Sequence, residues 1–165
     1  MDLKKAARDP WVWGQVGLIG LVLLGMPRLA ATGMLGGRMG APWPALAAGI
    51  AGLGGLVTWW GFGSLGPNLT PGTEPLAAGQ MVERGAYAWV RHPIYAGLSL
   101  FLAGWAGWTG NPATLVLAAV LSFGYFDRKA AAEERWMLAR FPAYAAYQQR
   151  VGKLWPRLGA RRGGS

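Results

Sequence analysis

The chain has 165 residues, of which 53% are hydrophobic and only 14% are charged, and its mean hydropathy is positive at +0.24. A soluble domain normally carries about a quarter charged residues, so the composition favours a small integral membrane protein. The counts of 27 Gly and 10 Trp agree, because Gly is frequent in membrane helices and Trp at membrane interfaces. With no Cys and a single His, we expect no disulfide, no thiolate nucleophile and no metal site.

The net charge of +9 raises the question of nucleic acid, but its distribution argues against that partner. The stretch 128–165 holds nine Lys or Arg and two Glu, so it contributes +7 of the total. A basic tail directly after an apolar segment is typical of a cytoplasmic anchor on anionic lipid. We therefore predict membrane lipids as partners and no nucleic acid.

Four apolar segments are predicted to form helices. The first, residues 11–26, has the basic flank and apolar middle of a signal peptide, but Trp11 and Trp13 are typical of an interfacial anchor and no clear cleavage site follows, so we favour a retained span. The second, residues 43–62, has the ~20 residues needed to cross a ~30 Å hydrocarbon core. Its glycines allow close helix packing within the chain or between copies, which leaves a homo-oligomer open: Gly49, Gly52, Gly54 and Gly55.

The last two segments, residues 93–108 and 112–126, are joined by Gly110-Asn111-Pro112, which predicts a tight helical hairpin. Helix-forming residues continue to Arg140. A helix over 113–140 would be about 42 Å long and so exceeds the bilayer core. The predicted fold is an all-α integral membrane protein with about four transmembrane helices, the last two a tight hairpin extended by a cytoplasmic C-terminal helix.

Basic residues number three before the first segment and nine after the last, whereas the loop between the first two segments has only Arg28 and Arg38. The positive-inside rule places both termini and the loop 63–92 in the cytoplasm, beneath the inner membrane if the protein is bacterial. No repeat or domain boundary is visible. We expect one domain over 1–158 and disorder in residues 159–165.

The antiparallel hairpin predicts that His92 and Glu133 are neighbours, although 41 positions separate them. Arg91, His92 and the unpaired N–H groups at the start of the third segment suit a carboxylate, and Glu133 suits an ammonium. A ligand with both groups on one carbon is an amino acid, and S-adenosylmethionine carries that group. Aromatic rings would stack on its adenine or face its sulfonium: Tyr87, Trp89 and Tyr95. Each residue also has a purely structural interpretation, as an interfacial anchor, a solvated glutamate or a helix-capping histidine.

These residues belong to a longer motif. It reads Val82-x-x-Gly85-x-Tyr87-x-x-x-Arg91-His92-Pro93-x-Tyr95-x-Gly97, followed by Glu133-Glu134 and then by Phe141-x-x-Tyr144-x-x-Tyr147-x-x-x-Val151 and Pro156. In this motif the chain resembles the isoprenylcysteine carboxyl methyltransferase family, which shares its core with the phospholipid N-methyltransferases. The resemblance covers 61–156. It implies an integral membrane methyltransferase that uses S-adenosylmethionine and acts on a lipophilic acceptor, such as an isoprenylcysteine carboxylate.

The resemblance implies cofactor contacts at the following positions, to which the charge argument adds Arg91: Gly79, Gln80, Met81, Val82, Tyr87, His92, Pro93, Ile94, Tyr95 and Glu133. Several of the contacts at residues 79–82 would be backbone ones. Where the family often has an Arg that contacts the substrate carboxylate, this chain has Lys129, with Arg128 adjacent. Lys keeps the charge but lacks the bidentate fork. The usual Phe-Gly-x-x-Tyr is one residue shorter here, at residues 141–144.

Two acceptor chemistries remain open. A carboxylate is already nucleophilic and needs only charge positioning, by Lys129 or Arg128, whereas an amine must lose a proton, for which Glu134 is the candidate acceptor. In either case we expect the pocket to open to the cytosol for the cofactor and to lipid, between the second and fourth segments, for the substrate. The alternatives are a phospholipid amine N-methyltransferase, a nicotinamide-dependent membrane reductase and a non-catalytic membrane scaffold.

Overall fold

The computed structural model describes residues 8–69 and 79–157. Within these two ranges the chain is helical and contains no strand, so the prediction of an all-α fold is confirmed. The predictions that concern residues 70–78 and the tail 159–165 lie outside the described residues.

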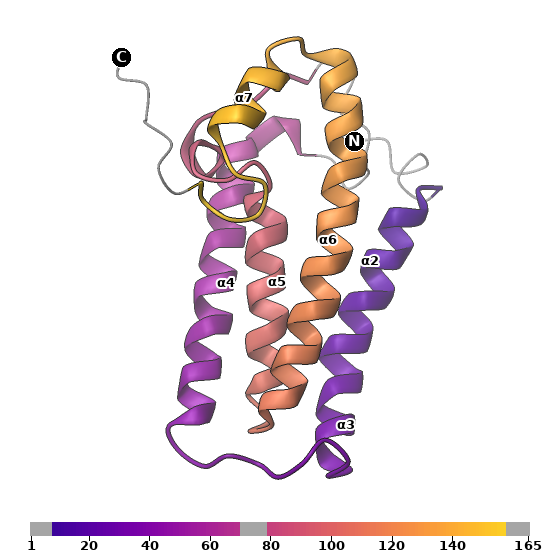
Figure 1. Cartoon of the computed structure of the whole chain (residues 1–165), viewed down its shortest axis with the longest axis vertical. Helices are drawn as coiled ribbons and strands as arrows, with labels where there is room; N and C mark the ends of the chain where they lie inside the picture. Colours follow the sequence, from indigo (N-terminus) through magenta and orange to yellow (C-terminus); the bar gives the residue numbers. More distant parts are fainter. Residues whose placement is uncertain (1–7, 70–78, 158–165) are drawn as a thin grey trace.

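The long helices lie side by side in one bundle (Figure 1). The first is built from three consecutive sections, which are α2 (Pro10–Gly20), the π-helix η1 (Leu21–Gly25) and α3 (Met26–Ala31). It is followed by α4 (Trp43–Leu65), α5 (Pro93–Gly107) and α6 (Pro112–Arg140). The short elements η2 (Gly66–Asn68), η3 (Gly85–Ala88) and α7 (Tyr144–Arg150) lie at one end of the bundle. The loop 32–42 and the turn between α5 and α6 lie at the other.

Two helices are long and apolar enough to cross a membrane by length and composition, Pro10–Ala31 and Trp43–Asn68. The helix α5 is apolar but has 15 residues. The helix α6 has 29 residues and continues past its apolar part through charged residues to Arg140. The hairpin of α5 and α6 is present, and the count of four transmembrane helices stays a prediction.

Hydrogen bonds fix both ends of the first helix to this hairpin. Pro27 has no N–H, so the carbonyl of Leu23 lacks the helical donor four residues on. The indole N–H of Trp105 on α5 donates to this carbonyl at 3.2 Å. Near the other end of the first helix, the hydroxyl of Tyr125 on α6 donates to the carbonyl of Trp11. The first helix is therefore held against both arms of the hairpin.

The helices α4 and α5 pack with their backbones in contact. A Cβ placed on Gly54 would lie 2.3 Å from the backbone nitrogen of Phe101, and one placed on Gly104 would lie 2.4 Å from that of Ala51. Only glycine fits at such a distance. By contrast, Gly49, Gly52 and Gly55 have no atom within 4 Å of the position their Cβ would take. Of the four glycines noted in the second segment, Gly54 is the one at this interface.

This packing predicts a sharp difference between two similar substitutions. Gly54→Ala should lower the stability of the folded protein by about 1–3 kcal/mol, because α4 and α5 must move apart to admit the methyl group. Gly52→Ala, its matched control, should leave stability unchanged or raise it by up to ~1 kcal/mol, because alanine favours a helix and meets open space there. Thermal unfolding of the two purified variants in detergent measures both effects, and equal melting temperatures would contradict the packing.

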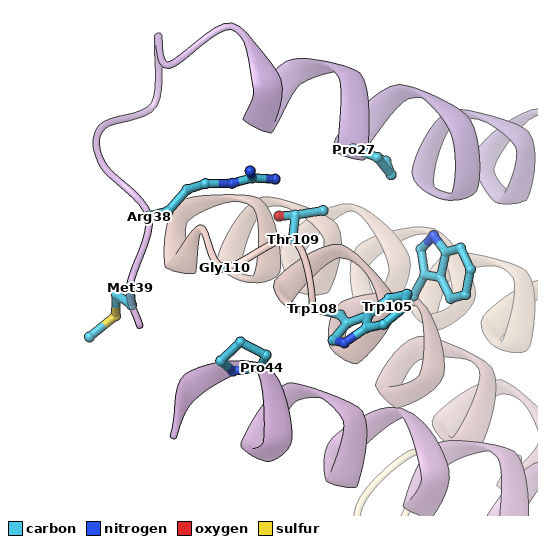
Figure 2. A pocket seen from close by; sticks show the side chains of 8 residues that line it. All are labelled: Pro27, Arg38, Met39, Pro44, Trp105, Trp108, Thr109 and Gly110. Carbon is cyan, nitrogen blue, oxygen red and sulfur yellow. The ribbon is translucent and has the colours of Figure 1, made fainter. Parts of the chain in front are cut away.

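An open groove of about 480 Å³ lies at the end of the bundle formed by the loop 32–42 and the α5–α6 turn (Figure 2). The residues that line it come from the first helix, this loop, α4, α5 and the turn that follows α5. The polar cluster of Arg, His and Glu lies at the opposite end, where α5 begins and α6 ends.

Candidate functional site

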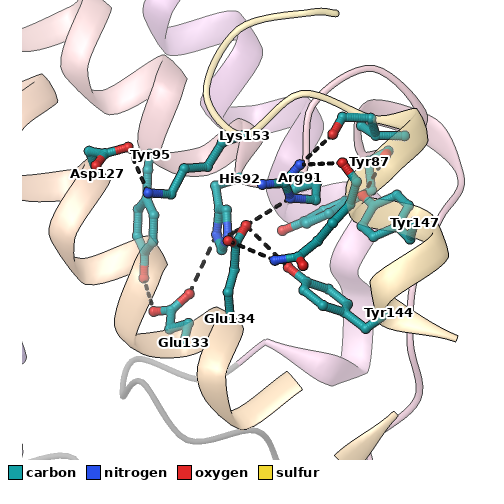
Figure 3. A network of polar contacts seen from close by, with 12 residues as sticks. Tyr87, Arg91, His92, Tyr95, Asp127, Glu133, Glu134, Tyr144, Tyr147 and Lys153 are labelled. Carbon is teal, nitrogen blue, oxygen red and sulfur yellow. Dashed lines mark hydrogen bonds and ion pairs between the residues drawn. The ribbon is translucent and has the colours of Figure 1, made fainter. Parts of the chain in front are cut away.

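The residues that precede α5 are held by a segment that follows α7. Val90 and Gly152 form an isolated parallel bridge. The backbone N–H groups of Arg91 and His92 donate to the carbonyls of Gly152 and Lys153 at 2.8 and 3.0 Å. As a result, Arg91 and His92 are fixed at the start of α5 and face the glutamates of α6 (Figure 3).

Glu134 on α6 accepts most of the hydrogen bonds in this cluster. Arg91 Nε donates to its Oε1 at 2.7 Å, and His92 Nε2 lies 3.2 Å from the same oxygen. Gln148 Nε2 donates to Oε2 at 3.0 Å, and the Tyr144 hydroxyl to Oε1 at 3.4 Å. Burial acts to raise the pKa of this carboxyl, but the hydrogen bonds from His92 and Arg91 outweigh it and lower the pKa to about 2. Glu134 is therefore an anion whose partners are all supplied by the protein.

Arg91 is held from two sides, and its side chain is only 10% exposed. Besides the ion pair with Glu134, its Nη1 donates to the carbonyls of Gln148, at 3.2 Å, and Val151. A guanidinium with three acceptors in place has few donors left for a ligand. Arg91 therefore positions Glu134 and joins α5 to α7, and its predicted role in cofactor binding stays a prediction.

His92 lies between the two adjacent glutamates. Its Nδ1 is 3.6 Å from Glu133 Oε2, and its Nε2 is 3.2 Å from Glu134 Oε1. The ring stacks on Tyr95 with a centroid distance of 5.6 Å and an interplanar angle of 4°. The side chain makes no capping hydrogen bond to α5, so the helix-capping interpretation does not apply. The predicted proximity of His92 and Glu133 is confirmed.

Glu133 differs from its neighbour in how it is compensated. The Tyr95 hydroxyl donates to its Oε1, and His92 lies near its other oxygen. Desolvation by burial outweighs these interactions and raises the pKa of the carboxyl. The anion of Glu133 is thus less well compensated than that of Glu134. A carboxylate in this condition gains free energy from an incoming cation.

Lys129 lies one helical turn before Glu133 on α6 and is 1% exposed. Its Nζ donates to Oε1 of Gln15 on α2 at 2.6 Å and lies 5.2 Å from the centre of the Tyr95 ring. Desolvation lowers the pKa of this ammonium, although the charge of Glu133 acts to raise it. The structure therefore places a buried cation beside the cluster, at the contact between α2 and α6.

Tyr87, Pro93 and Ile94 also border the cluster. Tyr87 in η3 is fixed through its carbonyl, which accepts the hydroxyl of Tyr147 at 2.6 Å. Burial raises the pKa of its phenol, and the charge of Glu133 adds to that effect, so the two groups are close in electrostatic terms. Pro93 and Ile94 form the first turn of α5, where the missing N–H of proline is no loss.

Residues 79–82 and Arg128, which were also predicted to belong to the site, make no hydrogen bond to Glu133 or His92 among the described residues. In the segment 79–82, the N–H of Gln80 donates to Oδ1 of Asn68 at 2.8 Å. Arg128 is exposed on the surface of α6, whereas Lys129 is buried. The roles assigned to residues 79–82 and to Arg128 stay predictions.

Two side chains in the cluster, Gln15 and Gln148, were not predicted from the sequence, and Tyr144 was noted only as a position of the motif without a role. Gln15 carries a usable signal, because it is the one amide or charged side chain in the first apolar segment, and a lone polar group there favours a functional or packing role. Tyr144 and Gln148 are four residues apart and therefore share one face of α7. That spacing predicts that the two side chains share one face of α7, but it does not predict which carboxylate that face contacts.

The bundle and this cluster together define a class of protein: apolar helices that carry a buried Arg-His-Glu site at one end. The profile of the family described as phospholipid methyltransferase matches residues 43–143. The chain belongs to the phospholipid methyltransferase family.

The relatives agree with the resemblance seen in the motif. The chain is 32% identical over 73 residues to the protein-S-isoprenylcysteine O-methyltransferase of Saccharomyces cerevisiae, covering 44% of this chain and 30% of that protein. It also resembles the solved structure of a eukaryotic intramembrane Ras methyltransferase, an isoprenylcysteine carboxyl methyltransferase, with a TM-score of 0.64 and 26% identity. That match covers 69% of this chain and 42% of the other. The chain thus spans less than half the length of either relative, and the predicted kinship with the isoprenylcysteine carboxyl methyltransferases is confirmed.

Proposed function

We propose that the protein is an integral membrane methyltransferase that uses S-adenosylmethionine to methylate a lipophilic acceptor, with a carboxylate as the favoured group. The observation that carries the proposal is Glu133, a carboxylate of raised pKa held beside the start of α5. Kinship with an O-methyltransferase supports the reaction class.

The donor set fits the amino-acid group of this cofactor. Glu133 would accept its ammonium, because this partly buried carboxylate lacks a cation of its own that fully compensates it. The N–H groups of Ile94 and Tyr95 in the first turn of α5 have no acceptor among the described residues, and such groups bind a carboxylate. The rings of Tyr87 and Tyr95 would face the sulfonium. When bound, S-adenosylmethionine supplies an electrophilic methyl group.

The state of Glu134 favours a carboxylate acceptor over an amine. An amine must lose a proton before it can attack, and the candidate proton acceptor was Glu134. With a pKa of about 2 and hydrogen bonds from four side chains, Glu134 is a weak base. A carboxylate acceptor needs no base and only a cation to align it, which Lys129 offers. The phospholipid methyltransferase profile keeps an amine lipid as the second candidate.

We further propose that the first helix, α4, α5 and the apolar part of α6 cross the membrane. The cluster would then lie at the cytoplasmic end, where the cofactor is available. Two observations support this orientation: the basic residues concentrate after residue 127, and α6 extends beyond its apolar part as far as Arg140. The lipophilic part of the acceptor would approach from the bilayer.

The function is tested with protein reconstituted in lipid nanodiscs and S-adenosylmethionine labelled in its methyl group. We expect label to enter a farnesylated cysteine or a lipid acid from a total lipid extract. Mild base should release that label as methanol, because methyl esters hydrolyse and N-methyl groups do not. Base-stable label in phosphatidylethanolamine would establish the amine alternative instead. Thermal stabilisation by a nicotinamide dinucleotide, and none by S-adenosylhomocysteine, would contradict the proposed class.

A further inference from the structure

At the end of the bundle opposite the cluster, the groove is bordered by the loop 32–42, which is held in place by the α5–α6 turn (Figure 2). Hydrogen bonds fix the loop 32–42 on the α5–α6 turn. The N–H of Met39 donates to the carbonyl of Gly110 at 2.7 Å, and Nδ2 of Asn111 donates to the carbonyl of Gly36 at 3.2 Å. Asn111 is fully buried. This part of the loop is therefore positioned by the hairpin itself.

The fixed loop holds Arg38 over the turn. The Cβ of Arg38 lies 3.5 Å from the position that a Cβ on Gly110 would take, and the guanidinium extends along the groove towards Thr109 (Figure 2). Among the described residues no carboxylate or carbonyl pairs with this guanidinium. The other arginine at this end, Arg28, differs because its Nη1 donates to the carbonyl of Leu24 at 2.7 Å. Arg38 thus presents an uncompensated positive charge to the groove.

The remaining wall of the groove is apolar and aromatic. Trp105 uses its indole N–H on the carbonyl of Leu23, so its ring and that of Trp108, 6.0 Å away between centroids, offer apolar surface. Trp108 is 57% exposed. Pro27 and Pro44 complete the wall. A cation at one side of an aromatic groove suits a molecule with an anionic head and a hydrocarbon body.

The distance between the two ends of the bundle matches a bilayer. From Pro112 at the turn to Glu133 in the cluster, α6 rises about 33 Å at ~1.5 Å per residue, and a hydrocarbon core is ~30 Å thick. With the cluster at one membrane surface, the groove is at the headgroup level of the other. The molecules present there in excess are phospholipids.

We propose that this groove binds one membrane phospholipid from the leaflet opposite the cluster, with Arg38 holding its phosphate and the indole rings of Trp105 and Trp108 contacting its acyl chains. The occupant is an anionic phospholipid of the phosphatidylglycerol type, because its phosphate has no ammonium of its own to compete with Arg38. The proposal goes beyond methyl transfer and does not depend on it, but it rests on the membrane orientation proposed above.

The test is native mass spectrometry of the full chain in detergent with long-chain phosphatidylglycerol added. The wild type should retain one lipid, and Arg38→Gln should weaken its binding about tenfold or more, as expected for a charged hydrogen bond. Arg28→Gln, which removes the same charge from the same end, should bind as the wild type does. Diacylglycerol, which lacks the phosphate, should bind as weakly to the wild type as phosphatidylglycerol does to Arg38→Gln.

Three outcomes would overturn the proposal. They are equal binding by the wild type and Arg38→Gln, an equal loss in Arg28→Gln, and displacement of the lipid by millimolar inorganic phosphate, which would indicate a site for free anions. If Arg38→Gln does not fold, Trp108→Ala tests the same groove, because this exposed ring can be removed without opening a cavity in the core. It should weaken binding of long-chain phosphatidylglycerol more than of the dihexanoyl form, and no difference between the two lipids would also overturn the proposal.

Discussion

Glu134→Gln lowers the melting temperature by about 5–10 °C, whereas Glu133→Gln, at the adjacent position, leaves it unchanged or raises it. We expect this contrast because the protein compensates the anion of Glu134 better than that of Glu133. The pKa of the Glu134 carboxyl falls from 4.5 to about 2 on folding, so its charge stabilises the folded state at neutral pH. The pKa of the Glu133 carboxyl is raised, so its charge opposes folding.

The pH dependence of the melting temperature follows from the same two pKa shifts. The contribution of Glu134 is fully present above about pH 4.5 and is lost as the pH falls towards 2. The melting temperatures of the wild type and Glu134→Gln should therefore converge below pH 4.5. For Glu133 the sign is opposite: its penalty exists above its folded-state pKa and disappears when the carboxyl is protonated. Thermal unfolding from pH 7 to pH 3.5 in detergent measures both trends.

Glu133→Gln, which should not lower the melting temperature, should instead lower the affinity for the cofactor product. Under the proposed function, Glu133→Gln removes the partner of the ligand ammonium and weakens S-adenosylhomocysteine binding by about 30-fold or more. Calorimetry on the same preparations measures it. Glu83→Gln is the control, because the pair of Glu83 with Arg150 is largely exposed and its loss should change neither quantity. Wild-type affinity in Glu133→Gln would remove this residue from the cofactor site.

The second large effect is expected at Lys129. Lys129→Met should lower kcat/KM for a carboxylate acceptor by about 100-fold or more, as for the loss of a charged group that aligns a reactant. Affinity for S-adenosylhomocysteine should fall less than kcat/KM, because Lys129 donates its hydrogen bond to Gln15 and its interactions with Tyr95 and Glu133 are longer-range. Lys129→Arg should restore part of the activity, and assays with the labelled cofactor and a farnesylated cysteine measure all three.

The neighbouring cation provides the control for this experiment. Arg128→Gln removes the same charge one residue away on the exposed side of α6, and we expect wild-type kinetics. An amine acceptor gives a different pattern, because a nearby cation opposes a protonated amine, and Lys129→Met would then keep or gain activity. Unchanged kcat/KM in Lys129→Met thus argues against the carboxylate, and a loss in Arg128→Gln argues against the assignment of Lys129.

The hairpin and the approach of His92 to Glu133 could be predicted because they depend on local signals. The Gly-Asn-Pro turn fixes the antiparallel register, and the run of helix-forming residues carries α6 beyond its apolar part. The division of roles between Glu133 and Glu134 could not be predicted, because it depends on Tyr144 and Gln148. Those side chains lie beside α6 only because the chain turns back at residues 141–143, and this short turn has no hydrophobic periodicity from which its direction could be predicted.

Helix packing is a second feature that could not be predicted from the sequence. The helix α4 is apolar on all sides, so its sequence does not indicate which face meets a neighbour. The four glycines at residues 49, 52, 54 and 55 could not be told apart in the sequence, yet of these four only Gly54 packs against α5. The bond between Gln15 and Lys129 joins positions 114 apart. Such a contact follows from the arrangement of whole helices rather than from any local pattern.

The bridge between Val90 and Gly152 has a consequence for biosynthesis. Residues 152 and 153 are synthesised after α4, α5 and α6, so the acceptors that they offer to Arg91 and His92 arise later than the three helices. During that interval Arg91 has neither its backbone acceptor at Gly152 nor the carbonyls of Gln148 and Val151. The cluster can therefore close only after the helices have been synthesised, so a chain that stops before residue 152 would lack the contacts that order the site.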